Sequence, residues 1–243
     1  MKTFRAMLVG LTSATLIGVP GAAMASAPVT LSLAASSPAS LQLAVARHRT
    51  SIRFLDTDHI KPAGATGLVR GQVVGSSQGT RGALAGVQVK LYRQLDGSRT
   101  WTYLGSRVTD DGAFPRFAFS VLARQNAHYR VVFGGNDGFL PTEKSTWLSV
   151  YRVFNGAIAD GPAAATLHGH VSPYYTHKDI SLQKSSCDGC DYVTVKHAVT
   201  GVDGAYSFSL PAPAQGKWWW RLTIPKTVAY IASIGSTFST ERK

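Results

Sequence analysis

Two cysteines and a group of histidines are the side chains whose types and spacing could do chemistry in this 243-residue chain. Cys187 and Cys190 flank an Asp-Gly pair, which is typical of a hairpin turn. A β-turn brings the α-carbons of its first and fourth residues within about 7 Å, and a disulfide spans about 4.4 to 6.8 Å. The spacing therefore predicts a disulfide between Cys187 and Cys190. Redox catalysis would require this motif at a helix N-terminus, and no helical pattern surrounds it.

A metal site is the competing use of these residues. His168 and His170 are two apart, so on a strand both imidazoles face one side, and His177 and His197 follow in the same part of the chain. The cysteines are expected at the tip of a hairpin, away from the His-x-His strand, and oxidation would remove their thiolates. The nearest approach to a calcium loop, Asp56-Thr57-Asp58, supplies too few ligands. We therefore expect neither a metal nor a cofactor.

The run Trp218-Trp219-Trp220 is the strongest candidate for a binding surface. If the strand alternates, Trp218 and Trp220 point into a core, while Trp219 and Arg221 point outward. On the neighbouring strand we expect Tyr192, Thr194 and Lys196 to point outward and Val193 and Val195 to be buried. Aromatic rings with basic edges suit stacking on a sugar ring or binding an acidic polymer. The predicted ligand-binding residues are Trp219, Arg221, Tyr192 and Lys196.

Two alternatives compete with this surface. Trp219 could instead pack against the other domain or cover a sheet edge. A secreted hydrolase would show a concave cluster of acids or a Ser-His pair, but the chain has few acidic residues. Its one Gly-x-Ser-x-Gly match, Gly75-Ser76-Ser77-Gln78-Gly79, falls in a glycine-rich segment with no helical pattern after it, whereas a nucleophile elbow needs a strand-turn-helix. We predict no catalytic residues and no enzyme activity.

The elements that position these residues come from an internal repeat. Tyr129-Arg130-Val131-Val132-Phe133 and Ser145-Thr146-Trp147 recur 91 residues later as Trp220-Arg221-Leu222-Thr223-Ile224 and Ser236-Thr237-Phe238. A period of this size is typical of an immunoglobulin-like sandwich rather than a solenoid repeat of about 20 to 50 residues. Trp101 is the expected core tryptophan of the first unit.

Short alternating apolar runs, punctuated by Gly, Asp-Gly and Pro, predict an all-β chain of two tandem immunoglobulin-like β-sandwiches. In the first unit, strands are expected near 50–55, 67–74, 87–93, 101–108, 116–121, 128–133 and 145–153. In the second, they are expected near 165–171, 179–184, 191–199, 205–210, 217–224 and 236–240, with 150–154 as its first strand. The predicted segments are a signal peptide at 1–25, a flexible linker at 26–46 and domains at 47–154 and 155–243.

The aligned motifs also carry a family resemblance. Gly71-Gln72-Val73 matches Gly169-His170-Val171, and Asp111-Gly112-Ala113-Phe114 matches Asp203-Gly204-Ala205-Tyr206. The extra length of the first unit is expected in a glycine-rich loop at 76–86. This pattern resembles the tandem immunoglobulin-like and carboxypeptidase regulatory-like repeats of secreted actinobacterial proteins. The resemblance covers about residues 49–243 and implies a β-sandwich fold with an accessory or adhesive role.

The N-terminus predicts export. Lys2 and Arg5 precede an apolar run and the small residues Ala23-Met24-Ala25, as in a secretory signal peptide. Cleavage there would leave 23 basic against 13 acidic residues, a net charge of about +10 that favours anionic partners. No dedicated nucleic-acid arm and no membrane segment in the mature chain are expected. We expect a secreted, non-catalytic module, held at the cell wall or released, that binds wall polymer, glycan or a surface protein. The alternative is a structural spacer.

Overall fold

The computed structural model describes residues 46–77, 79–161 and 164–241. The predicted signal peptide at 1–25 and almost all of the predicted linker lie outside these residues. The described part is all-β, as predicted, and its single helical turn is the 3₁₀ segment η1 (Val202–Gly204). Among the described residues, no helix has the length and apolar character needed to cross a membrane.

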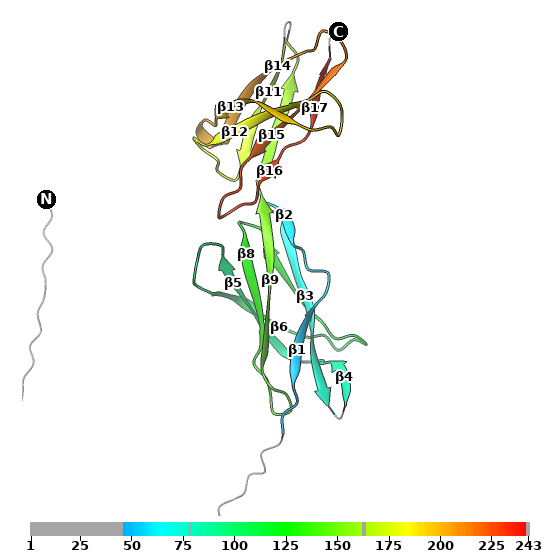
Figure 1. Cartoon of the computed structure of the whole chain (residues 1–243). Helices are drawn as coiled ribbons and strands as arrows, with labels where there is room; N and C mark the ends of the chain where they lie inside the picture. Colours follow the sequence, from blue (N-terminus) through cyan, green and yellow to red (C-terminus); the bar gives the residue numbers. More distant parts are fainter. Residues whose placement is uncertain (1–45, 78, 162–163, 242–243) are drawn as a thin grey trace, which may run out of the picture. The chain divides into compact units, whose positions relative to one another are not determined.

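Seventeen strands make up the described chain (Figure 1). The first nine are β1 (Thr50–Phe54), β2 (Ile60–Pro62), β3 (Thr66–Ser77), β4 (Thr80–Ala83), β5 (Gln88–Leu95), β6 (Thr102–Val108), β7 (Phe117–Leu122), β8 (Ala127–Phe133) and β9 (Thr142–Tyr151). The others are β10 (Val153–Ala159), β11 (Ala164–Ser172), β12 (Asp179–Ser185), β13 (Val193–Val199), β14 (Ala205–Pro211), β15 (Lys217–Ile224), β16 (Ser233–Ile234) and β17 (Phe238–Glu241). Each strand predicted from alternation is present within a few residues.

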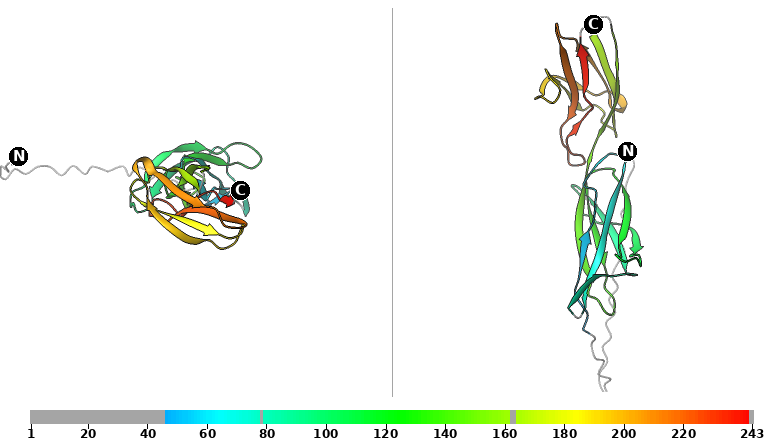
Figure 2. Two further views of the ribbon diagram at one scale, coloured as in Figure 1. Left: turned by 90° about the horizontal axis from the view of Figure 1, so that it is seen from above. Right: turned by 90° about the vertical axis from the view of Figure 1, so that its right-hand side faces the viewer.

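The strands form four sheets that enclose two separate cores (Figures 1 and 2). In what we call the first sandwich, β1-β3-β4 with β7 faces the sheet β2-β9-β8-β5-β6. In the second sandwich, β10-β11-β14 faces the sheet β13-β12-β15-β16, with β17 also pairing β15. The chain from residue 44 onward groups as one compact unit, so the boundary at 154/155 stays a prediction.

The two copies of the repeated stretch lie on equivalent strands. Tyr129, Val131 and Phe133 of β8 are buried in the first core. Trp220, Leu222 and Ile224 of β15 are buried in the second. The repeat therefore reflects shared interior packing, as predicted. Trp218 also packs against the second core, which confirms the inward half of the tryptophan alternation.

The glycines of the repeated Gly-x-Val motif make room for aromatic rings. Gly71 of β3 lies opposite Phe117 in the register, and an added Cβ would be 2.7 Å from the Phe117 ring. Gly169 of β11 lies opposite Tyr206, and an added Cβ would be 2.8 Å from its hydroxyl oxygen. Such close approach is a common reason for glycine inside a strand. The motif is therefore a packing device in both sandwiches.

Three local features depart from the predictions. The 76–86 segment is not a loop, because β3 extends to Ser77 and turns back as β4 in a hairpin. Trp101 is not a core residue but lies half-buried against Arg130. The final strand of the second sandwich is shifted by one residue, since Trp220 pairs with Phe238 whereas Tyr129 pairs with Thr146. This shift turns Phe238 toward its core and leaves the matching Trp147 exposed.

Candidate ligand-binding face

The outer face of the sheet β13-β12-β15 carries a row of polar side chains. Thr194, Gln183 and Arg221 lie opposite one another on these three strands. Residues opposite each other in an antiparallel ladder project to the same side of the sheet. Because Leu222 and Leu182 of the same strands fill the core, this row faces away from it.

Arg221 is the centre of this row. Its guanidinium carbon lies 4.0 Å from the centre of the Tyr192 ring, within cation–π range. Its Nε donates a hydrogen bond of 2.8 Å to Gln183 Oε1, and Gln183 Nε2 donates in turn to Thr194 Oγ1 over 3.3 Å. Among the residues described, Arg221 has no carboxylate partner. The side chain is thus held in place while its two terminal nitrogens remain available to an external acceptor.

A shallow groove of about 670 Å³ continues from Arg221 along the same face. Its lining includes Ser181, His197 and Thr223, which can all form hydrogen bonds with a polar ligand. Ser181 Oγ and His197 Nδ1 lie 3.0 Å apart. This is the Ser-His pair that the hydrolase alternative requires, but within the described ranges no carboxylate bonds the imidazole. A nucleophile activated by a base also needs that base to be oriented by a third group.

The predicted contribution of Lys196 to this face is wrong. A β-bulge displaces the register between Leu182 and Gln183, so that Lys196 lies opposite Leu182 and His197 opposite Ser181. Lys196 therefore projects from the core side of the sheet at its exposed edge, and His197 takes its place in the groove. One additional residue in a strand moves every following side chain to the opposite face of the sheet. No local pattern in the sequence marks this bulge.

The prediction that Val193 and Val195 are buried is also wrong. Val193 is 60% exposed and Val195 47% exposed. β13 is the edge strand of its sheet, and its valines extend past the limit of the core. Of the four residues predicted to bind a ligand, Tyr192 and Arg221 are in contact. Trp219 is half-buried and lies two positions from Arg221 on the same face of β15, whereas Lys196 faces the other side.

The β12–β13 connection is fixed by the predicted disulfide between Cys187 and Cys190, whose α-carbons are 5.4 Å apart. Gly189 in this turn has a positive φ of 77°, as does Gly97 at the aligned position of the first sandwich, at 80°. Positive φ explains the Asp-Gly sequence at both turns. The disulfide closes the turn immediately before Tyr192, the residue that stacks on Arg221.

Replacing both cysteines with serine is expected to cost about 2 kcal/mol of unfolding free energy, because the closed loop is only four residues long. Urea denaturation of the oxidised wild type and of Cys187→Ser/Cys190→Ser would measure it. Reduced wild type is the matched control and should behave like the variant. A loss above about 4 kcal/mol would show that the bridge supports more than this turn.

The first sandwich holds the counterpart of the Arg221 arrangement. Arg130, 91 residues earlier, lies 4.3 Å from the centre of the Trp101 ring, and Trp101 is itself 91 residues before Tyr192. Here the arginine is ion-paired, with Arg130 Nη1 3.4 Å from Glu143 Oε1. An arginine stacked on an aromatic side chain is therefore common to both sandwiches, but among the described residues an acid pairs with the arginine of the first sandwich alone.

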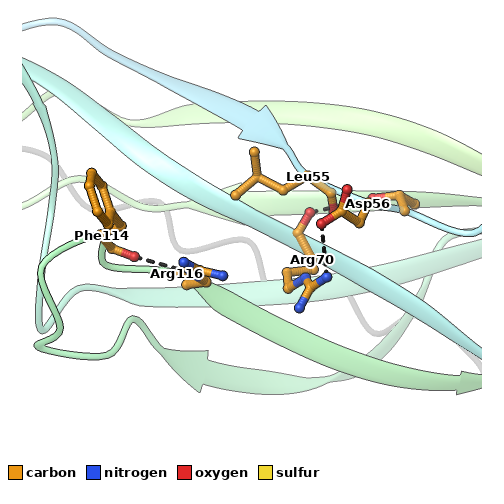
Figure 3. Close-up of polar contacts among 6 residues, drawn as sticks. Leu55, Asp56, Arg70, Phe114 and Arg116 are labelled. Carbon is orange, nitrogen blue, oxygen red and sulfur yellow. Dashed lines mark hydrogen bonds and ion pairs between the residues drawn. The ribbon is translucent and has the colours of Figure 1, made fainter.

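The acids of the calcium candidate are paired within the protein. Arg70 Nη2 donates to Asp56 Oδ2 over 3.0 Å (Figure 3). The single hydroxyl proton of Thr57 is within reach of two acceptors, the carbonyl oxygens of Leu55 at 3.5 Å and Arg70 at 3.4 Å. Asp58 accepts a hydrogen bond from the Leu68 amide and lies 3.2 Å from Lys61 Nζ. In the part of the chain that the structure describes, no three His, Cys, Asp or Glu side chains cluster as metal ligands. The histidine alternative also loses its thiolates, since both cysteines are in the disulfide.

The pKa shifts arise from packing and do not mark a reactive group. Burial raises the pKa of the Tyr129 and Tyr206 hydroxyls above the usual tyrosine value. Burial likewise raises the pKa of Tyr175, whose hydroxyl donates to the Asp179 carbonyl oxygen. All three tyrosines belong to the cores. They remain neutral at physiological pH.

Comparison with known proteins identifies no family. No family model and no curated protein matches the chain. Among solved structures, the human OSCAR ligand-binding domain is 13% identical, with a TM-score of 0.27, over 79% of this chain and 99% of that one. A biofilm-associated protein BSP domain is 10% identical, with a TM-score of 0.26, over 78% of this chain and only 29% of that one. Likenesses this weak carry no argument about function, and the repeat family stays a resemblance.

Proposed function

We propose that this chain is an exported, non-catalytic binding protein whose second sandwich holds an anionic wall polymer or glycan at the cell surface. The observation that carries the proposal is the Arg221 side chain, fixed by Tyr192 and Gln183 but without an acidic partner among the described residues. A cation held in this way can bind an anion at little cost in conformational entropy.

Three further features support this reading. The groove beside Arg221 is lined with hydroxyl, amide and imidazole groups suited to sugar hydroxyls, and also with the carboxylate of Asp179, which can accept hydrogen bonds from them. Trp219 lies on the same face and offers a ring for stacking. The excess of basic over acidic residues favours polyanions over the whole surface, and the disulfide is consistent with an oxidising compartment outside the cytoplasm.

Retention on purified cell wall and on immobilised anionic polysaccharides tests the proposal. Arg221→Ala is expected to weaken retention at least tenfold, because a hydrogen bond to a charged group contributes about 1.5 to 3 kcal/mol and each 1.4 kcal/mol is about a factor of ten. Trp219→Ala should weaken it by a smaller factor. Lys196→Ala is the matched control, since it removes one positive charge from the edge of the same sheet without touching the groove.

Retention of Arg221→Ala and Trp219→Ala equal to that of the wild type would remove the proposed site. Equal losses for Arg221→Ala and Lys196→Ala would mean that only net charge matters. A purely structural spacer predicts no retention of the wild-type protein on any polymer.

A further inference from the structure

Both sandwiches contain an arginine stacked on an aromatic ring, but the two arginines differ in whether a carboxylate from the neighbouring strand pairs with them. In the first, Glu143 of β9 lies opposite Val132 and reaches Arg130. In the second, the position opposite Thr223, which corresponds to Val132, is Ile234 of β16. Glu143 and Ile234 are 91 residues apart, the spacing of the repeat. The second sandwich thus has an apolar side chain where the first has the acid that occupies its arginine.

Ile234 lines the groove beside Arg221 and is 58% exposed. An isoleucine this exposed at a sheet edge contributes little to the core, and it leaves the guanidinium open. The first sandwich therefore shows which chemical group this position suits. That group is a carboxylate. In the first sandwich, the Glu143 carboxylate approaches the Arg130 guanidinium on the outer face of the sheet, while the Trp101 ring stacks on the guanidinium.

We propose that the groove of the second sandwich binds the carboxylate of an acidic polysaccharide, a polymer of sugar acids, in the place that Glu143 takes beside Arg130. This inference rests on the proposed function and makes its ligand specific. Arg221 Nε is already used by Gln183, so the terminal nitrogens would contact the carboxylate. Ser181, His197 and Thr223 then lie where the hydroxyl groups of the same or the next sugar would come.

A polysaccharide fits this face better than an acidic peptide. An extended peptide is usually recognised through main-chain hydrogen bonds to an open sheet edge. The groove instead lies mostly across the outer face of β12 and β15, whose backbone groups are paired with neighbouring strands. The edge strand that it reaches, β16, is only two residues long and offers little edge for a peptide to pair with. Over β12 and β15 the ligand would therefore be contacted by side chains. Side-chain hydroxyl, amide and imidazole groups match the many hydroxyls of a sugar chain.

The test introduces a glutamate at position 234, which corresponds to Glu143 of the first sandwich, so that it pairs with Arg221 within the chain. Binding of wild type, Ile234→Glu, Ile234→Gln and Arg221→Ala to polygalacturonate, a polymer of uronic acid, would be measured by isothermal titration calorimetry. Ile234→Glu is expected to reduce affinity at least tenfold, because it occupies Arg221 within the chain. Ile234→Gln has the same shape without the charge and should change affinity less than threefold. Thermal melts would confirm that the exposed substitutions leave the fold intact.

The choice of probes separates the possible failures. Full methyl esterification of polygalacturonate should abolish binding to wild type, and dextran sulfate should bind less tightly than the free uronate polymer. Equal binding of the esterified polymer, or unchanged affinity in Ile234→Glu, would overturn the carboxylate assignment while the Arg221 site stands. Binding of poly-glutamate as tight as that of polygalacturonate would overturn the sugar assignment. Unchanged binding in Arg221→Ala would instead overturn the proposed function itself.

Discussion

Replacing Trp220 with alanine is expected to lower the free energy of unfolding by about 3 to 5 kcal/mol, the usual cost of truncating a buried tryptophan. Trp220 is 2% exposed in the second core and packs edge-on against Trp218 with ring centres 5.9 Å apart. Its indole Nε1 also donates a hydrogen bond of 2.9 Å to Thr240 Oγ1. The substitution therefore opens a cavity and leaves a buried hydroxyl without its donor.

Trp219→Ala is the matched control, because it removes the same side chain from the neighbouring position on the outer face. It should change stability by about 1 kcal/mol or less, since partly exposed side chains outside the core contribute little. Chemical denaturation followed by circular dichroism measures both variants. Comparable losses in the two proteins would show that the tryptophan run does not divide between core and surface as the structure has it.

Gly169→Ala is expected to be the second most damaging change, lowering stability by about 3 kcal/mol, at the upper end of the cost of overpacking. An added Cβ would overlap the Asn155 carbonyl oxygen and lie 2.6 Å from the Gly156 α-carbon. Both of these are backbone atoms of β10, so no rotation of a side chain can relieve the overlap. The pairing of β10 with β11 would have to distort.

Gly82→Ala provides the comparison, because Gly82 is also inside a strand but has no atom within 4 Å of the added Cβ. Its stability should change by about 0.5 kcal/mol or less. Thermal unfolding of the two variants gives the difference. A Gly169→Ala protein as stable as Gly82→Ala would mean that β10 and β11 are not held as closely as the structure places them.

The strand positions could be predicted because alternation and turn chemistry are local. The buried residues of β8 and β15 alternate along the sequence, and the Asp-Gly turns at Gly97 and Gly189 require the positive φ that they show. The disulfide followed from the same turn. The sequence also predicts Arg221 and Tyr192 on one face of the sheet, as observed, but it puts them on neighbouring strands, whereas β12 lies between β13 and β15.

The composition of the binding face could not be predicted fully, because it depends on register rather than on pattern. The bulge opposite Leu182 and Gln183 exchanges Lys196 for His197, and nothing in the run from Val193 to Val199 marks the additional residue. A buried tryptophan is common in such sandwiches, which is why the sequence predicts a core position for Trp101. Its spacing of 91 residues from Tyr192 was the available signal for a surface stack on arginine.

The open edge of β13 has a consequence for how copies of this protein behave at high concentration. An edge strand with exposed valines can pair with the edge of another molecule. Lys196 projects from that edge, and the bulge beside it breaks the regular spacing of the free backbone groups. Charge and irregularity of this kind oppose edge-to-edge aggregation. The charge of Lys196 is thus placed where it would oppose such pairing.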